Sequence, residues 1–513
     1  MTTREHSLEV TLSPRRRWAA LTVLSASLLV VVLDMTILNV ALPKLTADLR
    51  PSAQQVLWIV DVYSLVLAGL LVSVSALADR FGRKRMLIIG FAVFGISSAL
   101  VLLAHSAAFV IALRAVLGLG GAMIMPTTLS MIRVIFPDPA ERATALGIWA
   151  AVSAGGAAIG PIVGGVLLEH FSWQAAFLVN LPFMVLAIAA SWWLLPESRD
   201  PEPGRWDFVG TALSVVGMVG LVWSIKHLGS VRTLADAPGL AVLGASLSVL
   251  TWFVLRCLRR PDPLLDLSLF TRRPFVAGVI GALFTMFGIG SVLLLLAQWF
   301  QLVENLSPLM TGVALLPLAA ANLVSSVVAA GLAKRLGVRV VVAGGLLLAG
   351  VGVAGFGLIP TPGILAAEIM MVLLGLSGGS LAMSSAMIMS GSPAERAGNA
   401  ASMEETSYEV GTVLGIAVLG TIAALLYRDR LSANASGLTG IDPGALAESA
   451  ESIGSATAIA ERTGSPGLRD AAVDAFNTSF LDTSLIGGLV LIAVAVAVYL
   501  LVPRRFDLTT QAH

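Results

Sequence analysis

The stretch SALADRFGRKRML, from Ser75 to Leu87, places one carboxylate and four basic residues in a short turn between two long apolar runs. A similar turn, LAKRLGVR from Leu332 to Arg339, lies between two later apolar runs, and Leu, Ala, Arg and Gly recur in the same register. Parallel repeats of this kind are one way to build a membrane protein from two related halves that meet at a substrate site. The echo therefore predicts two related helical bundles.

The composition requires lipid as the solvent for most of the chain. Of the 513 residues, 57% are hydrophobic and 12% are charged, and the mean hydropathy is +0.90. A soluble protein cannot bury that much apolar surface, and one span takes about 20 mostly apolar residues. We therefore expect an all-α integral membrane protein with fourteen transmembrane helices, near residues 18–42, 54–78, 86–105, 107–133, 142–168, 173–196, 208–226, 238–256, 275–301, 307–333, 339–359, 363–390, 397–426 and 479–502.

Three groups of helices are expected. Residues 1–200 form an N-terminal six-helix bundle, residues 201–262 a linker with two inserted helices, and residues 263–513 a C-terminal six-helix bundle. The C-terminal bundle carries an external loop at 427–477. In this loop Asp442-Pro443 and Ser465-Pro466 each predict an N-cap followed by Pro at the first helical position, and hence two short surface helices.

The basic residues predict the orientation. Lys and Arg in the expected inner segments outnumber those in the outer segments by roughly three to one, which favours cytoplasmic N- and C-termini. The first apolar stretch lacks a small-residue cleavage site and is interpreted as a retained helix. A single cysteine, Cys257, excludes a disulfide framework or a cysteine-based metal site, and no metal site is expected.

The turn at Ser75–Leu87 resembles the signature loop of the major facilitator superfamily, with Ser75 where that family usually has Gly. The resemblance implies the superfamily fold of two six-helix bundles, here with two inserted helices. In the family, the Asp and Arg of this loop form a latch between the halves. The residues that match the latch are Asp79, Arg80, Gly82 and Arg83.

A glycine-rich run, AGGAAIGPIVGG from Ala154 to Gly165, lies in the fifth expected span. Small residues at four-residue spacing let helices approach closely, and Pro loosens the backbone. Ordinary helix packing is the alternative interpretation. The run is similar to the antiporter motif that marks exporters in the superfamily, which favours export over uptake. The matching residues are Gly156, Gly160, Pro161, Gly164 and Gly165.

Ionisable residues inside the expected spans are candidate functional residues, because burying a charge in a bilayer is costly. Arg114, in RAVLGLGGAM, resembles a family motif implicated in proton transfer, with Leu117 in place of the usual Gln. Asp34 and Asp61 are expected at similar depth in the first two spans. The pattern LDMTILNVALP around Asp34, and LWIVDVYSL around Asp61, resemble the 14-span drug:H⁺ antiporters, and in particular the quaternary-ammonium exporters of the QacA and SmvA type.

Three acids stand close together in AASMEETSYEVG, residues 400–411. Glu405 and Glu409 are four residues apart and share one helix face, whereas Glu404 is rotated by about 100°. Two close carboxylates repel each other in a low dielectric, so such a pair binds protons or an organic cation readily. The segment resembles the acidic span that lines the drug vestibule in QacA-type exporters. The alternative is a helix end at which the acids reach inner water.

Further residues are candidates for the vestibule. Tyr63, Tyr408 and Trp58 offer ring faces to a cation. Asn322 stands where the QacA-type exporter has an acidic residue tied to divalent cations, which favours monovalent cations here.

The leading hypothesis is a proton-coupled multidrug exporter of lipophilic organic cations such as quaternary ammonium compounds, dyes and biguanides. A narrow self-resistance exporter for one secondary metabolite is the first alternative, and a drug panel would separate the two. A membrane enzyme or lipid flippase is the second, but no nucleophile–base constellation or phosphate-binding loop supports an enzyme or ATP as energy source.

We accordingly expect a monomer in the plasma (inner) membrane with no cofactor besides protons as the coupling ion. Its expected partners are small cationic drugs and membrane lipid, without nucleic acid.

Overall fold

The computed structural model describes residues 12–49, 51, 53–199, 207–230, 236–260, 263–265, 267–306, 308–390, 397–435, 442–450 and 453–503. Secondary structure in this part of the chain is helical throughout, without strands. The expected all-α fold is confirmed.

The N-terminal helices pack as one bundle in which α1 and α4 are central. The helix α1 contacts α4, α5 and α7, and α4 contacts α2 and α3. The elements are α1 (Pro14–Leu49), α2 (Ala53–Phe81), α3 (Arg83–Leu100), η1 (Val101–Leu103), α4 (Ala107–Ile135), α5 (Pro139–His170), α6 (Ala175–Leu178) and α7 (Asn180–Leu194).

The C-terminal helices form a second bundle around α10, α13 and α15. The helix α10 contacts α15, α16 and α19, and α13 contacts α14 and α19. The elements are η2 (Leu267–Thr271), α10 (Arg273–Gln298), the π-helical turn η3 (Trp299–Val303), α11 (Pro308–Ala314), α12 (Leu316–Leu336), α13 (Val338–Gly357), α14 (Ile364–Gly375), α15 (Gly378–Ser390), α16 (Ala397–Asn434), α17 (Pro443–Ser449), α18 (Ile453–Thr463) and α19 (Pro466–Leu501).

The two inserted helices, α8 (Phe208–Ser230) and α9 (Ala237–Arg259), form a hairpin. The helix α8 contacts both α2 of the first bundle and α16 of the second. A small apolar cluster joins the three helices through Leu65 and Ala68 of α2, Val222 of α8 and Val413 of α16. The bundles also meet directly, because α5 contacts α12 and α15, and α16 contacts α2 and α4.

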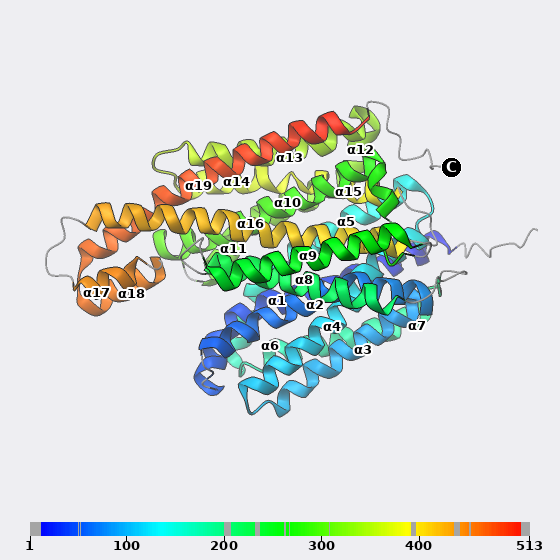
Figure 1. Ribbon diagram of the computed structural model, residues 1–513, viewed down its shortest axis with the longest axis horizontal. Coiled ribbons are helices and arrows are strands. Elements are labelled where there is room, and N and C mark those ends of the chain that lie inside the picture. The colour runs from blue at the N-terminus through cyan, green and yellow to red at the C-terminus, as the bar shows by residue number, and fades with distance from the viewer. Residues whose placement is uncertain are drawn as a thin grey trace, which may run out of the picture.

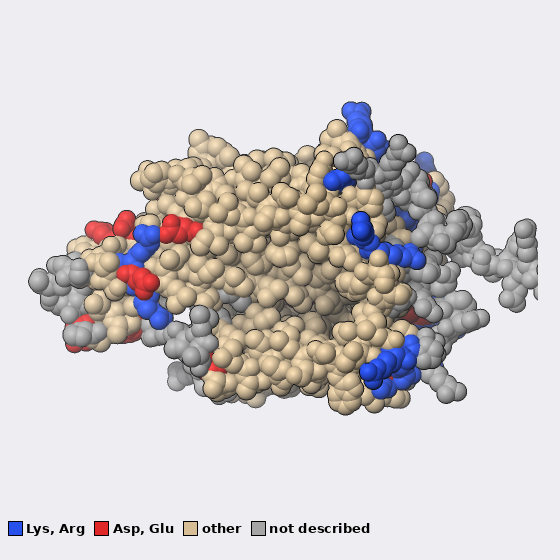
Figure 2. Space-filling view, turned by 45° about the horizontal axis from the view of Figure 1, so that its top comes forward, with Lys and Arg blue, Asp and Glu red and all other residues tan. Residues whose placement is uncertain are grey.

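Thirteen helical segments of the described chain are long and apolar enough to cross a bilayer. The remaining expected span coincides with the 32-residue helix α5, which includes the apolar stretch Thr144–Ser153 among its described residues. In Figure 1 the long helices run roughly parallel, and α1 begins at the same end of the molecule at which α19 ends. Figure 2 shows a middle band without charged side chains on the visible face and Lys and Arg gathered at that end. We call the end at which α1 begins and α19 ends the basic end.

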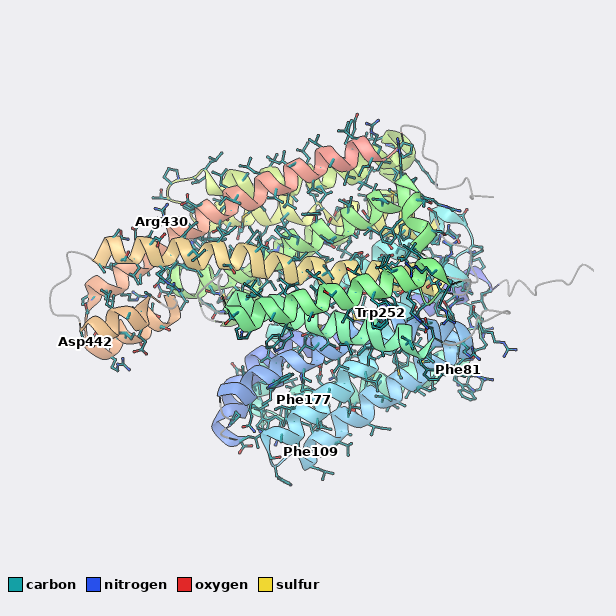
Figure 3. The ribbon with its side chains drawn as sticks, in the orientation of Figure 1. Phe81, Phe109, Phe177, Trp252, Arg430 and Asp442 are labelled. Carbon is teal, nitrogen blue, oxygen red and sulfur yellow. The ribbon has the colours of Figure 1, made fainter. Side chains whose placement is uncertain are left out.

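The opposite end of the molecule carries the α17–α18 hairpin. Figure 3 places Asp442 and Arg430 at this end and Phe81 at the basic end. The side chain of Asp442 caps α17 by accepting hydrogen bonds from the amides of Gly444 and Ala445, as its sequence predicts. The second predicted N-cap is confirmed in position, because Ser465 precedes Pro466 at the start of α19, but the Ser465 side chain makes no capping hydrogen bond and the helix is 36 residues long rather than short. The second short helix is α18 instead.

Three of the expected spans are broken helices. The segment 363–390 is interrupted between α14 and α15, the segment 307–333 at Leu315, and the segment 173–196 after α6. The first break lies among Gly375, Gly378 and Gly379, which let the chain pass close to α12. Glycine has a low helix propensity, so a turn is tolerated there.

Candidate functional site

Asp34 of α1 lies at the centre of a buried network in the first bundle. One carboxylate oxygen accepts a hydrogen bond from Nη1 of Arg114 on α4 at 2.7 Å, and the other accepts one from Nδ2 of Asn180 on α7 at 2.8 Å. All three side chains are no more than 2% exposed. Since a buried ion pair is tolerated only when its hydrogen bonds are satisfied, the network fixes the charge of Asp34 against that of Arg114.

Arg114 is also held from α2. Its Nε donates to the backbone oxygen of Ile59 at 3.1 Å, and its guanidinium carbon lies 4.5 Å from the ring centroid of Tyr63. A guanidinium above a tyrosine ring is attracted by the ring quadrupole. The Tyr63 hydroxyl is buried and has no hydrogen-bond partner among the described residues. The network therefore joins α1, α2, α4 and α7, so a change in the charge of Asp34 alters interactions of all four helices.

The acids of α16 form a second buried group. Glu404 and Glu405 are both 0% exposed. The hydroxyl of Tyr408 donates a hydrogen bond to Oε1 of Glu404. Both carboxylate oxygens of Glu405, in contrast, accept no hydrogen bond from the part of the chain that the structure describes. A buried carboxylate without a donor is costly unless it holds a proton or a cation.

Glu409 links the two groups. It is half-buried, and it interacts electrostatically with Glu405 one turn earlier on α16 and with Tyr63 on α2. Glu409 thus connects the acids of the second bundle with Tyr63, the neighbour of Arg114, where α16 contacts α2 and α4. The alternative that the acids lie at a helix end in contact with water is wrong for Glu404 and Glu405, because both are fully buried.

Trp149 was not a candidate from sequence, yet it lies beside the acids. Its ring centroid is 6.4 Å from that of Tyr408, and its indole Nε1 donates to the Thr128 hydroxyl at 3.2 Å. The side chain is buried between α4, α5 and α16. Tryptophans in spans usually lie at the bilayer surfaces, so the signal that could have identified Trp149 is its position inside a charge-free run.

The other vestibule candidates are placed differently. Asn322 of α12 is 0% exposed, and neither polar atom of its amide has a hydrogen-bond partner among the described residues. Trp58 lies near the start of α2 with 39% of its surface exposed, so the structure does not bring it into either buried group. The side chain of Asp61 lies outside the described residues.

The latch residues Asp79, Arg80, Gly82 and Arg83 connect α2 and α3 at the basic end. Nε and Nη2 of Arg83 donate to Oδ1 of Asp79 at 2.9 and 2.7 Å, and Nη1 donates to Ser198 Oγ at 2.8 Å. Gly82 has φ of 110°, a conformation that favours glycine. The hydrogen bonds of Arg83 described above lie within the first bundle. A latch to the second bundle stays a prediction.

The glycine motif of α5 packs against α1. A Cβ atom at Gly156 would lie 3.0 Å from Leu29 Cδ1, and one at Gly160 would overlap the hydroxyl of Thr36, two residues from Asp34. Gly164 is buried, whereas a Cβ atom at Gly165 would meet nothing within 4 Å. The side chain of Pro161 lies outside the described residues. The motif therefore sets the distance between α1 and α5 at the depth of Asp34.

Metal-binding potential is low in the described part of the chain. It contains no group of three or more His, Cys, Asp or Glu side chains that could hold a metal ion.

Comparisons with known proteins were made by sequence and by structure. Residues 24–416 match the family model described as Major Facilitator Superfamily. The chain is 39% identical over 503 residues to the multidrug efflux pump LfrA of Mycolicibacterium smegmatis, covering 96% of this chain and 98% of the relative. It is 35% identical over 495 residues to the methyl viologen resistance protein SmvA of Salmonella typhimurium, covering 94% and 98%.

Two solved structures share the fold at low sequence identity. The human organic anion transporter MFSD10 (TETRAN) has a TM-score of 0.59 and 15% identity, with 94% of this chain and 100% of that chain covered. A bacterial homologue of the human lysosomal transporter Spinster, inward-facing and unoccupied, has a TM-score of 0.57 and 18% identity, with 96% and 98% covered.

Proposed function

Since the chain belongs to the Major Facilitator Superfamily, we propose that it is a proton-coupled antiporter that exports lipophilic organic cations. The chain is a multi-pass membrane transporter and not an enzyme. Export of drugs is supported by its relatives, which include a multidrug efflux pump and a methyl viologen resistance protein. The proposed cargo comprises quaternary ammonium compounds, cationic dyes and biguanides.

The observation that carries the proposal is the buried carboxylate of Glu405, whose oxygens accept no hydrogen bond from the described residues. A proton or a bound cation compensates the charge of Glu405. A carboxylate that has taken a proton attracts a cation less strongly. The Tyr408 hydroxyl donates a hydrogen bond to the neighbouring Glu404, and its ring lies 6.4 Å from that of Trp149; such rings favour lipophilic cations. Glu404 and Glu409 add negative potential on the same helix.

Asp34 is the proposed proton site in the other bundle. When Asp34 is charged, Arg114 is held by it and its positive charge is compensated. When Asp34 takes a proton, Arg114 loses its counter-charge and is drawn towards the acids on α16, of which Glu409 interacts electrostatically with the neighbouring Tyr63. A guanidinium near those acids weakens the binding of a second cation by like-charge repulsion. Proton uptake and cation release are thereby coupled.

The proposed setting is the plasma membrane with both termini in the cytoplasm. The concentration of Lys and Arg at the basic end supports this orientation (Figure 2). Protons would enter from the side of the α17–α18 hairpin and leave at the basic end. We propose that the protein acts as a monomer, with no ATP and with protons as the coupling ion.

Purified protein in proteoliposomes tests the proposal. Addition of a lipophilic cation such as ethidium or tetraphenylphosphonium should release protons from wild type, and an ionophore that collapses the pH gradient should stop ethidium transport. Glu405→Gln should lose cation-induced proton release, whereas the exposed Glu461→Gln on α18 is the matched control and should retain it. Transport that continues after the gradient is collapsed would contradict proton coupling.

A narrower exporter is the second candidate. The chain is 33% identical to a tetracenomycin C resistance and export protein of Streptomyces glaucescens, covering 80% of this chain and 76% of the relative. Growth of expressing and deletion strains against a panel of cationic dyes, biguanides and neutral antibiotics separates the two. Protection against one neutral compound alone would favour the narrower function.

A further inference from the structure

The two echo turns have the same local geometry. Gly82 joins α2 to α3 with φ of 110°, and Gly337 joins α12 to α13 with φ of 87°. Two residues later, each turn carries a cation that reaches the last helix of its own bundle. Nζ of Lys84 donates to the backbone oxygen of Trp192 at 2.8 Å and lies 5.8 Å from its ring centroid.

The second bundle repeats this contact. Nε of Arg339 donates to the backbone oxygen of Tyr499 near the end of α19, and its guanidinium carbon lies 3.8 Å from the ring centroid. In both bundles, therefore, a basic side chain binds the carbonyl and the ring of one aromatic residue. Trp192 and Tyr499 are 67% and 44% exposed, so both rings lie on the outside of the molecule.

The two turns differ in charge. In the first, Asp79 pairs with Arg83, and Glu197 accepts from the amide of Lys84 at 3.2 Å and lies 3.6 Å from Arg85. In the second, the positions of Asp79 and Arg83 are occupied by Lys334 and Val338.

Lys334 and Arg335 are exposed in the last turn of α12, and neither makes an ion pair with a residue that the structure describes. Two carboxylates thus offset part of the positive charge of the first turn, whereas the exposed cations of the second turn have no such partner among the described residues.

The exposed cations of the second turn lie beside apolar surface. The neighbouring side chains Leu332, Leu336, Val340 and Leu500 are 42%, 54%, 42% and 70% exposed. Basic side chains at the edge of such a surface lie at the depth of lipid headgroups, and a partly exposed tyrosine is favoured there too. The helix dipole alone would account for one basic residue in the last turn of α12, but it does not account for two exposed ones there followed by Arg339 at the start of α13.

We propose that the second echo turn, residues 332–339 together with Tyr499, binds the phosphate of an anionic phospholipid in the leaflet at the basic end. Lys334, Arg335 and Arg339 supply the positive charge, Tyr499 supplies an interfacial ring, and the leucines contact the acyl chains. The first echo turn has the same backbone but carries its own carboxylates, so it does not bind such a lipid. The site does not depend on the exported substrate.

Native mass spectrometry of the purified full-length protein tests this site. Phosphatidylglycerol and phosphatidylethanolamine of equal chain length are added at equal concentration, and wild type should retain phosphatidylglycerol several-fold better. Each basic residue near an anionic lipid contributes about fivefold to binding. Arg335→Gln should therefore reduce retention of phosphatidylglycerol about fivefold, and Lys334→Asp, which introduces the acid of the first turn, should reduce it further.

The matched control is Arg80→Gln, because Arg80 occupies the position of Arg335 in the first turn. This variant should retain phosphatidylglycerol as wild type does. The thermal unfolding temperature of each variant in detergent shows that it is folded. Equal retention by Arg335→Gln and wild type, equal loss in Arg80→Gln, or no preference for phosphatidylglycerol over phosphatidylethanolamine would each overturn the proposal.

Discussion

Asp34 and Glu405 are both fully buried carboxylates, yet their surroundings are opposite. Asp34 accepts hydrogen bonds from Arg114 and Asn180, one on each oxygen, and Arg114 is itself tied to α2. Glu405 accepts none from the described residues. The protein itself thus satisfies both oxygens of Asp34, whereas those of Glu405 remain open to a proton or a cation. The comparison shows that burial alone does not characterise an acid, since hydrogen-bond satisfaction separates an acid held in an internal ion pair from one whose oxygens can still accept a donor.

The largest effect is expected from Asp34→Asn. The variant leaves the Arg114 guanidinium buried without its counter-charge, which costs about 3–5 kcal/mol of unfolding free energy. Ethidium efflux should be abolished, because no group remains to take up the proton beside Arg114. Thermal unfolding in detergent and efflux from loaded cells measure the two effects. The double variant Asp34→Asn/Arg114→Gln should recover most of the stability and none of the transport, and full efflux by either variant would refute the role of Asp34.

Glu405→Gln should give the complementary result. The amide keeps the shape of the side chain and removes a charge that has no donor, so the free energy of unfolding should not fall. Binding of tetraphenylphosphonium should weaken about tenfold or more, equivalent to about 1.4 kcal/mol. Isothermal titration of purified protein measures the affinity. A stability loss as large as that of Asp34→Asn would remove the distinction between the two acids.

Gly160→Ala perturbs the Asp34 network without touching a charge. The added methyl group would overlap the hydroxyl of Thr36 and push α1 away from α5, and overpacking of this kind costs about 1–3 kcal/mol. Efflux should fall but not vanish, because Asp34 and Arg114 remain. Gly165→Ala is the control in the same motif, since its methyl group meets nothing within 4 Å and should leave the unfolding temperature unchanged.

The smallest effect is expected from Asp207→Asn. Asp207 is an acid of a third kind, because it forms an ion pair at the basic end of the inserted hairpin. Its hydrogen bonds from Arg256 hold the pKa of the Asp207 carboxyl below its ordinary value. Such a group stabilises the folded state above the unfolded pKa of about 3.9 and loses that contribution as the pH falls. Wild type should therefore unfold at a higher temperature than Asp207→Asn at neutral pH, and the difference should shrink below about pH 4. A difference that stays constant with pH would contradict the ion pair.

The helical architecture was largely predictable because apolar runs, the echo turn and the glycine motif are local signals. The family resemblance is confirmed by the comparisons. Helix breaks were missed where glycine clusters interrupt an apolar run, as between α14 and α15. The start of α19 at Pro466 was predicted, but its length was not, because an N-cap signal reveals where a helix begins and not how far it continues.

The site was predictable as a set of residues but not as a set of contacts. Asp34 and Arg114 were each identified from the cost of burying a charge, yet they are 80 residues apart, and their ion pair depends on how α1 meets α4. Asn180 and Trp149 were missed since neutral residues in spans carry no such signal. Glu404 was expected to be rotated by about 100° from the face of Glu405; both are nevertheless buried, because α16 is surrounded by other helices on several sides.

The position of α8 restricts how the two halves can move. It is tied to α2 by a hydrogen bond between Ser73 and Ser214 at 3.3 Å, and Gly69 lets it approach to the point where a Cβ atom would lie 2.6 Å from Val219 Cγ2. In the small apolar cluster that joins α2, α8 and α16, the helix α16 contributes one buried side chain, Val413. Rocking that parts α2 from α16 would have to part α8 from one of them, and the hydrogen bond and close approach of α8 to α2 favour opening of the α8–α16 seam.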